Sequence, residues 1–328
     1  MYLTIQGELV IANDYQNQDL YWALRGGGGG TFGVVVSVTL KTFPEPPVVI
    51  LNLNISFPDA DSMWSWVEGY FAALPAIDDA GGSGYYYIDP AGIIFGSPGF
   101  VTIHFFFDKT NVTAINEVFD PLYKQANNIN GTSVTNITVA LPQARAVYPA
   151  PYGSDGTGGN VLIGSRLYSR EFLETPSGPA TYVAAFKNIT TLTPVPIYQG
   201  HLTAGGQVAR NAYVVDSALN PSWRRALGEL IVPIGWADTT PVATQTEYRN
   251  LLTNTLVPIL AAVEPDMGAY TNEANAYEPH WQKVFWGYNY PRLWEVKQKW
   301  DPTGVFRCNR CVGSEKWDAA SALNCPAS

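Results

Sequence analysis

The amino-acid sequence predicts an α+β fold with a large antiparallel sheet that helices cover. The 328-residue chain is 46% hydrophobic and 13% aromatic, which is enough for sizeable cores. In its middle part, short β-branched or aromatic runs are interspersed with helical periodicities, a pattern typical of strands covered by helices. Near its N-terminus, a helical segment ends in five consecutive glycines and a β-branched run follows them.

The first 47 residues form the first predicted segment. Two strands joined by a turn at Gln6-Gly7 are expected first, then a helix over residues 17–24. One glycine is enough to end a helix, because glycine takes the left-handed C′ conformation without a Cβ penalty. Five in a row imply that a large group or a second backbone lies against them. Residues 34–40 predict a strand buried on both faces, and three prolines at 44, 46 and 47 mark a domain boundary.

Residues 48–262 form the second predicted segment, which carries the large sheet. Asp59 or Asp61 can cap its first helix, because their carboxylates accept hydrogen bonds from free backbone amides. Residues 149–160 are rich in Gly and Pro and predict a loop. Strands are expected at 48–57, 85–88, 93–95, 100–107, 196–202 and 210–215, helices at 59–73, 111–127, 166–172 and 180–188, and mixed or helical structure at 223–230 and 247–263.

Residues 263–328 form the third predicted segment. A strand is expected at 268–272, a short helix at 279–285, and a helix at 291–300 that ends at Asp301-Pro302. Tyr270 and Asn272 lie two residues apart on the predicted strand, so their side chains should face one side.

The glycine run does not match the dinucleotide-binding fingerprint. That motif runs from strand to G-x-G-x-x-G to helix, with phosphate at the helix N-terminus. Here the glycines follow a helix C-terminus, whose dipole repels phosphate. Spacing alone equally fits a tight, close-packed connection between helix and strand.

Composition excludes several partners. The net charge of −9 and the lack of a basic run argue against nucleic acid. No stretch of eighteen apolar residues predicts a membrane span, and the N-terminus leads into a strand without a signal peptide. The low lysine content, a pI near 4.8 and five sequons nevertheless favour a secreted glycoprotein. The sequons begin at Asn54, Asn111, Asn130, Asn136 and Asn188.

Three cysteines, Cys308, Cys311 and Cys325, cluster near the end of the chain. A zinc site there would need a fourth ligand, such as His104, His201 or His280. A disulfide between Cys325 and one of the other two fits an extracellular protein better. No metal site is therefore predicted.

Two long motifs resemble FAD-linked oxidases of the vanillyl-alcohol-oxidase type, in the berberine-bridge-enzyme-like branch. The first is DLYWALRGGGGGTFGVVVSVTLKTFP at residues 19–44, and the second runs from Tyr270 through residues 285–293 and Lys297 to residues 301–306. Between them, residues 151–160 and 218–224 resemble secreted fungal members described as isoamyl-alcohol-oxidase-like. The resemblance extends over essentially the whole chain.

This resemblance implies an FAD-dependent oxidase. Hydride would pass from an alcohol or carbohydrate hydroxyl to the flavin, and O2 would reoxidise the flavin and give H2O2. Residues 1–47 would be the C-terminal remnant of a PCMH-type FAD-binding domain, residues 48–262 the substrate domain, and residues 263–328 a berberine-bridge-type segment that returns to the FAD domain. The location would be extracellular.

The resemblance also assigns site residues. Tyr270 would be the catalytic base, and lowering its pKa from near 10 to 7 needs about 4 kcal/mol. Burial alone raises a tyrosine pKa, so a nearby cation or hydrogen-bond donor is required. Cofactor contacts are expected from Gly26, Gly27, Gly28, Gly29, Gly30, Thr31, Phe32, Gly33, Asn272, Tyr288 and Asn289, and substrate contacts from Gln199, His201, Gln207 and Tyr290.

The residues alone leave three of these assignments open. Tyr270 equally fits an aromatic core residue, and His201 fits a structural imidazole. Asn289 equally fits a cap for the helix that begins at Pro291, since proline favours the first helical turn.

Members of this family also carry an N-terminal α/β half that holds most FAD contacts, and nothing in this sequence corresponds to it. The chain is therefore expected to be a fragment, a truncated gene model or one of two associated chains, with a separate N-terminal FAD-binding half as partner. The alternative is a truncated, non-catalytic relative that acts as a binding or scaffold module.

Overall fold

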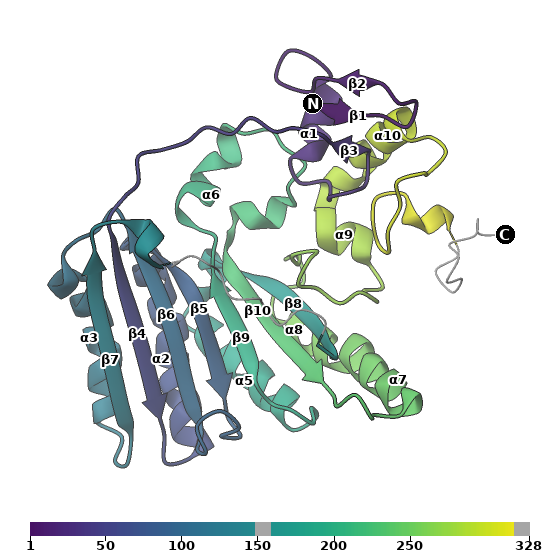
Figure 1. The fold of residues 1–328 in the computed structure, drawn as a ribbon. Helices are drawn as coiled ribbons and strands as arrows, with labels where there is room; N and C mark the ends of the chain where they lie inside the picture. The colour runs from purple at the N-terminus through teal and green to yellow at the C-terminus, as the bar shows by residue number, and fades with distance from the viewer. Residues whose placement is uncertain (148–158, 318–328) are drawn as a thin grey trace.

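The structure, a computed structural model, describes residues 1–147 and 159–317. These residues form a large sheet with helices and a small unit that holds the N-terminus (Figure 1). The predicted loop at 149–160 lies almost entirely outside the described residues. Within the described part of the chain, no helix has the length and apolarity needed to cross a membrane.

The large sheet has seven strands, all paired antiparallel, in the order β7-β4-β6-β5-β9-β10-β8. This confirms the predicted α+β class with a large antiparallel sheet. The strands are β4 (Val48–Ser56), β5 (Gly82–Asp89), β6 (Gly99–Phe107), β7 (Ser133–Leu141), β8 (Val161–Ser169), β9 (Tyr198–Leu202) and β10 (Ala226–Gly235).

Helices cover one face of this sheet and enclose the main core. In α2 (Ala60–Asp79), Asp59 caps the N-terminus, because its carboxylate accepts from the amide of Ser62 at 2.8 Å. Trp66 is fully buried in this helix and donates its indole N–H to Leu122 O. The other helices here are α3 (Val112–Asn127), α4 (Arg170–Leu173), α5 (Gly178–Thr190), α7 (Val242–Leu251) and α8 (Val257–Ala261), the last two joined by a π-helix at Leu252–Leu256.

The opposite face of the sheet carries a row of polar and aromatic side chains. Residues along a strand alternate between faces, and in β10 Leu230 and Val232 belong to the helix-side core. Glu229 therefore points away from the helices. The register pairs Glu229 with His201 of β9, and His201 with Tyr85 of β5. Three side chains from three adjacent strands thus lie in one row.

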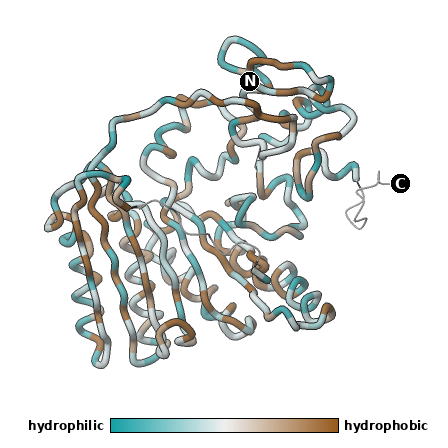
Figure 2. Tube along the Cα trace, viewed as in Figure 1, coloured by the Kyte–Doolittle hydropathy of each residue, from teal (hydrophilic) through white to brown (hydrophobic). Residues whose placement is uncertain are grey.

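The small unit is built from both ends of the described chain. Its three-stranded sheet contains β1 (Tyr2–Leu3), β2 (Leu9–Val10) and β3 (Val34–Val35). Against it lie α1 (Gln18–Leu24), α9 (Trp281–Trp286) and α10 (Tyr290–Trp300) (Figure 1). Figure 2 shows apolar stretches in the large sheet and again around the small one. The second core includes Leu20, Trp22, Phe32, Phe285, Trp286 and Leu293.

The predicted buried strand at 34–40 is wrong. Only Val34 and Val35 pair with β1, and the chain then runs extended to β4. Val38, Leu40 and Phe43 are 68–75% exposed. The amides of Val36 and Ser37 still donate to Met1 O, and the rest of the apolar run continues beyond the sheet. Residues 34–43 therefore form an exposed apolar strip.

Five other predicted elements differ from the structure. Residues 93–95 form a turn, because the amides of Ile93 and Ile94 donate to the carboxylate of Asp89. Residues 166–169 belong to β8, and residues 226–230 belong to β10. Residues 211–213 form a 3₁₀ turn, and 268–272 have no ladder. In the last segment, Leu167 donates one hydrogen bond to Gly268 O, but no regular pairing follows.

Candidate functional site

A cavity of about 450 Å³ lies where the small unit meets the large one. This volume is within the roughly 300–1,000 Å³ typical of small-molecule sites. Its walls come from the glycine loop, from the segment before β10, and from residues 269–272. The lining includes Arg25, Gly26, Gly28, Gly29, Gly30, Thr31, Phe32, Gly33, Leu219, Asn220, Trp223, Tyr270, Thr271 and Asn272, but not Gly27.

The glycines of the loop serve two different purposes. At Gly26, φ is +128°, and an added Cβ would lie 2.2 Å from the backbone nitrogen of Leu219. A Cβ on Gly27 would meet Ala23 O at 2.5 Å. The expectation of a close backbone approach is therefore confirmed at these positions. Gly29 and Gly30 have open space around the Cβ position and line the cavity, so packing within this chain does not require them to be small.

We expect Gly26→Ala to destabilise the protein by about 2–4 kcal/mol, because it combines an unfavourable φ with a backbone clash. Gly29→Ala is the matched control in the same loop. Gly29 has no neighbour within 4 Å of an added Cβ and lacks a positive φ, so its change should stay within about 0.5 kcal/mol. Urea unfolding of both variants measures the difference. Equal stabilities would show that the Gly26–Leu219 contact does not constrain the loop.

Tyr270 and Asn272 lie together on one wall of the cavity. Asn272 Nδ2 donates to the Tyr270 hydroxyl at 2.7 Å, and the Trp223 ring meets Tyr270 edge to face at 5.8 Å between centroids. The two side chains face one side as predicted, although the segment is not a strand. Asn272 thus fixes the position of the Tyr270 hydroxyl.

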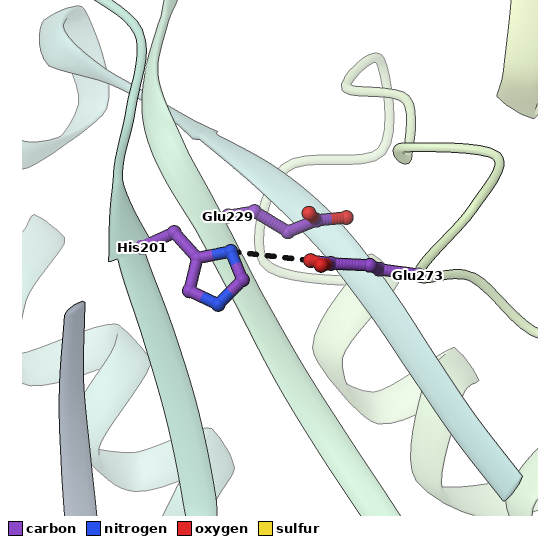
Figure 3. A group of neighbouring side chains, drawn as sticks. All are labelled: His201, Glu229 and Glu273. Atoms are coloured by element: carbon purple, nitrogen blue, oxygen red, sulfur yellow. Dashed lines mark ion pairs between the residues drawn. The ribbon is translucent and has the colours of Figure 1, made fainter. Parts of the chain in front are cut away.

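Behind Tyr270 lies a cluster of His201, Glu229 and Glu273 (Figure 3). Glu229 is 1% exposed, and one of its oxygens accepts from the backbone amide of Tyr270 at 3.1 Å. His201 Nδ1 lies 3.1 Å from Glu273 Oε2, close enough for electrostatic attraction but not aligned as a hydrogen bond. The cluster therefore supports the turn that carries Tyr270 and Asn272.

Burial keeps two groups of this cluster neutral. Desolvation raises the pKa of Glu229 to about 8, helped by the negative charge of Glu273. Burial lowers the pKa of His201, and Glu273 offsets this only in part. Gln199 Nε2 lies 2.6 Å from His201 Nε2 and donates to it. The proton of the neutral imidazole is therefore on Nδ1, facing Glu273.

Four other predicted site residues lie away from the cavity. Tyr288 is 80% exposed and borders a second cavity of about 840 Å³. The side-chain amide of Asn289 donates to Leu219 O. Asn289 therefore makes no side-chain cap bond to the helix that follows it, which was the alternative role expected from the sequence. The Tyr290 hydroxyl bonds to Glu315 at 2.7 Å. Gln207 is exposed on α6 (Gly206–Arg210) and bonds to Asn211.

Sequence reasoning missed Arg25, Glu229 and Glu273. Arg25 lines the cavity, with its guanidinium stacked on Tyr21 at 4.0 Å and bonded to Asp216 O. Glu229 is the only carboxylate within an otherwise apolar run, ALGELIVPIG, and that isolation was the available signal. A buried acid among apolar residues is a frequent mark of a functional site.

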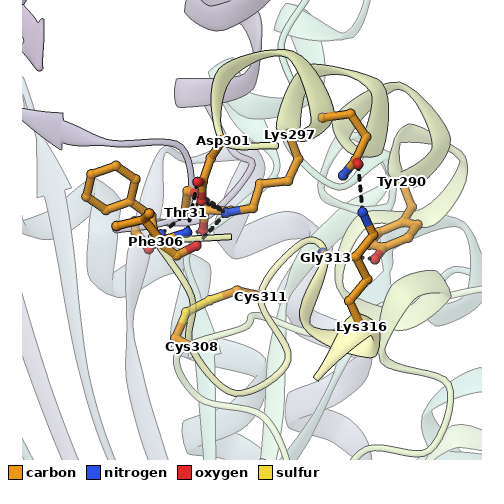
Figure 4. Close-up of polar contacts among 12 residues, drawn as sticks. Thr31, Tyr290, Lys297, Asp301, Phe306, Cys308, Cys311, Gly313 and Lys316 are labelled. Atoms are coloured by element: carbon orange, nitrogen blue, oxygen red, sulfur yellow. Dashed lines mark hydrogen bonds and ion pairs between the residues drawn. A yellow bond between two sulfur atoms is a disulfide. The ribbon is translucent and has the colours of Figure 1, made fainter. Parts of the chain in front are cut away.

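The second motif fastens the C-terminal segment to the glycine loop (Figure 4). Lys297 is almost fully buried and donates to Thr31 O at 2.6 Å, to Asp301 Oδ2 at 2.5 Å, and to Phe306 O. Asp301 in turn accepts from the amides of Val305 and Phe306. Lys297 thus connects three segments at one point.

The predicted disulfide partner is wrong. Cys308 and Cys311 form a disulfide with each other, whereas the prediction paired one of them with Cys325 (Figure 4). Cys325 itself lies outside the described residues. The close spacing brings the two Cα atoms within 5.3 Å, inside the range that a disulfide requires.

Comparison with known proteins gives consistent results. Residues 269–313 match the family model described as berberine and berberine like. An uncharacterized FAD-linked oxidoreductase of Arthroderma benhamiae is 44% identical over 324 residues, which are 96% of this chain and 55% of that protein. The FAD-linked oxidoreductase malF of Malbranchea aurantiaca is 35% identical over 96% of this chain and 53% of its own length.

The fold has close solved neighbours. A VAO-type flavoprotein of Myceliophthora thermophila superimposes with a TM-score of 0.85 at 26% identity, over 99% of this chain and 58% of the neighbour. The chain therefore spans about half the length of the curated relatives that it matches.

Proposed function

We propose that this chain, which is similar to the VAO-type and berberine-like FAD-linked oxidoreductases, forms the substrate-binding and C-terminal part of an FAD-dependent oxidase. The observation that carries the proposal is the arrangement of the 450 Å³ cavity. One wall presents unobstructed glycine backbone at Gly29 and Gly30, and another presents the Tyr270–Asn272 pair.

The residues that line the cavity fit a flavin dinucleotide. Gly28, Gly29 and Gly30 leave backbone open to a flat or extended ligand, since no side chain projects from them. Arg25 supplies a fixed guanidinium of the kind that pairs with phosphate. FAD, when bound, would accept the hydride from the substrate carbon and pass the electrons to O2, which yields H2O2.

Tyr270 is the proposed base for oxidation of an alcohol or carbohydrate hydroxyl. As the hydride leaves carbon, the phenolate of Tyr270 would take the hydroxyl proton. Asn272 donates to the same oxygen and so holds the phenol in position on the cavity wall. Trp223, edge-on to Tyr270, gives the cavity an apolar side against which a sugar or aromatic ring can pack.

The exposed apolar strip at residues 34–43 is proposed to be covered by the FAD-binding half of the whole protein. Val36, Val38, Leu40 and Phe43 are 53–75% exposed along one extended segment. Contiguous exposed apolar surface of this kind marks an interaction site. The relatives are about twice as long as this chain, which supports a further half.

An extracellular location is also proposed. The sequon asparagines Asn111, Asn130, Asn136 and Asn188 are exposed and accessible to a glycosyltransferase, whereas Asn54 lies within β4, which is paired on both sides. The Cys308–Cys311 disulfide is typical of an oxidising compartment.

Flavin binding tests the proposed oxidase. The whole protein, with its FAD-binding half, should copurify with flavin and show visible flavin absorbance. A Gly29→Leu variant should lower flavin content several-fold, because the new side chain fills the space left open beside the loop. Gly159→Leu is the matched control, since it adds the same bulk at a glycine that does not line the cavity. A colourless whole protein that binds no added FAD would leave the non-catalytic module as the better description.

A further inference from the structure

The cluster of His201, Glu229 and Glu273 has the composition of a metal site. The three residues come from β9, from β10 and from the turn after Tyr270, and one ligand atom of each lies within 4.8 Å of the other two. Figure 3 shows the two carboxylates side by side, with the imidazole facing Glu273. Three chain segments thus converge on one small volume with one nitrogen and two oxygen donors.

Unpartnered atoms supply a second, independent observation. Glu229 Oε2 and Glu273 Oε2 are both buried without a well-formed hydrogen bond among the described residues, although Glu273 Oε2 lies 3.1 Å from His201 Nδ1. Glu229 as a whole is 1% exposed. Buried polar atoms in native proteins are nearly always bonded, and an exception often indicates an unseen water or ion. Ser165 Oγ, from the neighbouring strand β8, is buried beside Glu229 and interacts with its carboxyl group.

We propose that His201, Glu229 and Glu273 bind a divalent transition-metal cation, Zn²⁺ or Mn²⁺. One imidazole and two carboxylates suit either ion. One dication balances the two carboxylates, so the buried group becomes neutral overall. Ligand distances of about 2.0–2.2 Å require the donors to approach by small side-chain rotations, and Ser165 or a water completes the coordination.

The surrounding contacts fit this assignment. Gln199 holds His201 Nε2, so the ring is oriented by a second partner as metal-bound imidazoles usually are. When a metal binds Nδ1 of His201, the ring proton is on Nε2. The Nε2–H then donates to the side-chain oxygen of Gln199, which a half-turn of the Gln199 amide brings into position. The other oxygen of Glu229 accepts from the amide of Tyr270. The cation would therefore position the turn that carries Tyr270 and Asn272.

Calorimetric titration of the chelator-treated 328-residue chain with Zn²⁺ and with Mn²⁺ tests the proposal. One equivalent of at least one ion should bind and raise Tm, because an ion that binds only the folded state stabilises it. Glu229→Gln and Glu273→Gln keep the side-chain shape and should each lower the affinity at least tenfold. Glu273 is the more exposed of the two, so its variant remains folded if the other does not.

Glu247→Gln is the control, since it removes an exposed carboxylate on α7 and should leave binding unchanged. The proposal is overturned if neither ion binds, or if both cluster variants bind the ion as tightly as the parent. The cluster would then be a pair of carboxyl groups, Glu229 and Glu273, that share a proton. The titration needs no flavin, so its outcome is independent of the proposed oxidase activity.

Discussion

Replacing Lys297 with methionine is expected to lower the free energy of unfolding by about 3–5 kcal/mol, the usual effect of removing one partner from a buried ion pair. The Lys297 and Asp301 side chains are 4% and 0% exposed, and their charged atoms lie 2.5 Å apart. Methionine would fill the space but leave Asp301 charged and buried. It would also free Thr31 O and Phe306 O, so the glycine loop and the C-terminal segment would lose their shared donor.

Lys299→Met in the same helix is the matched control. Lys299 pairs with Asp19 at 2.7 Å, but the two side chains are 61% and 31% exposed. Exposed pairs contribute about 0–1 kcal/mol, so this variant should unfold almost as the parent does. Chemical denaturation followed by tryptophan fluorescence measures both. Similar losses in the two variants would contradict the central role assigned to Lys297.

Replacing Tyr270 with phenylalanine should lower the turnover of the whole oxidase by about 10²–10⁴-fold, the range that a positioned general base contributes. The change removes only the oxygen to which Asn272 donates and leaves the ring against Trp223. KM should change little, because the shape of the cavity is kept. Steady-state O2 consumption measures both constants, and the pH dependence that the base imposes on kcat should disappear.

Tyr288→Phe provides the control for this prediction. Tyr288 belongs to the same C-terminal motif but is 80% exposed and does not line the 450 Å³ cavity. Its loss should leave kcat and KM unchanged. If Tyr270→Phe retains parental turnover while binding flavin normally, Tyr270 is an aromatic wall residue and the base must be another group.

Elements with local signals could be predicted from the sequence. Asp59 caps its helix as the pattern indicated, because capping depends on neighbouring residues only. β10 was missed because its run ALGELIVPIG is apolar on both faces and has no alternation. Such a run takes its conformation from the strands on either side, β9 and β8.

In the candidate site too, local relations could be predicted from the sequence and long-range contacts could not. Tyr270 and Asn272 could be placed together because they lie two residues apart. His201, Glu229 and Glu273 are separated by many residues. The register of β9 and β10 pairs His201 with Glu229, and the bond from the Tyr270 amide to Glu229 holds the turn that carries Glu273 against them. Gln207 was misplaced because it lies on a short helix, and the strand predicted next to it, at 210–215, contains a 3₁₀ turn instead.

The contacts that hold the small unit together join residues that are far apart in the sequence. This separation determines the order in which the molecule can fold. Trp286 donates to Gly26 O across 260 residues, and Lys297 reaches Thr31 across 266. The entropy of closing such loops must be lost before their contacts form, so these contacts form late. The large sheet, whose strands between residues 48 and 235 pair with one another, can nucleate without either end. The cavity between the two units therefore comes into being only at the last folding step, when the sheet already exists as a template.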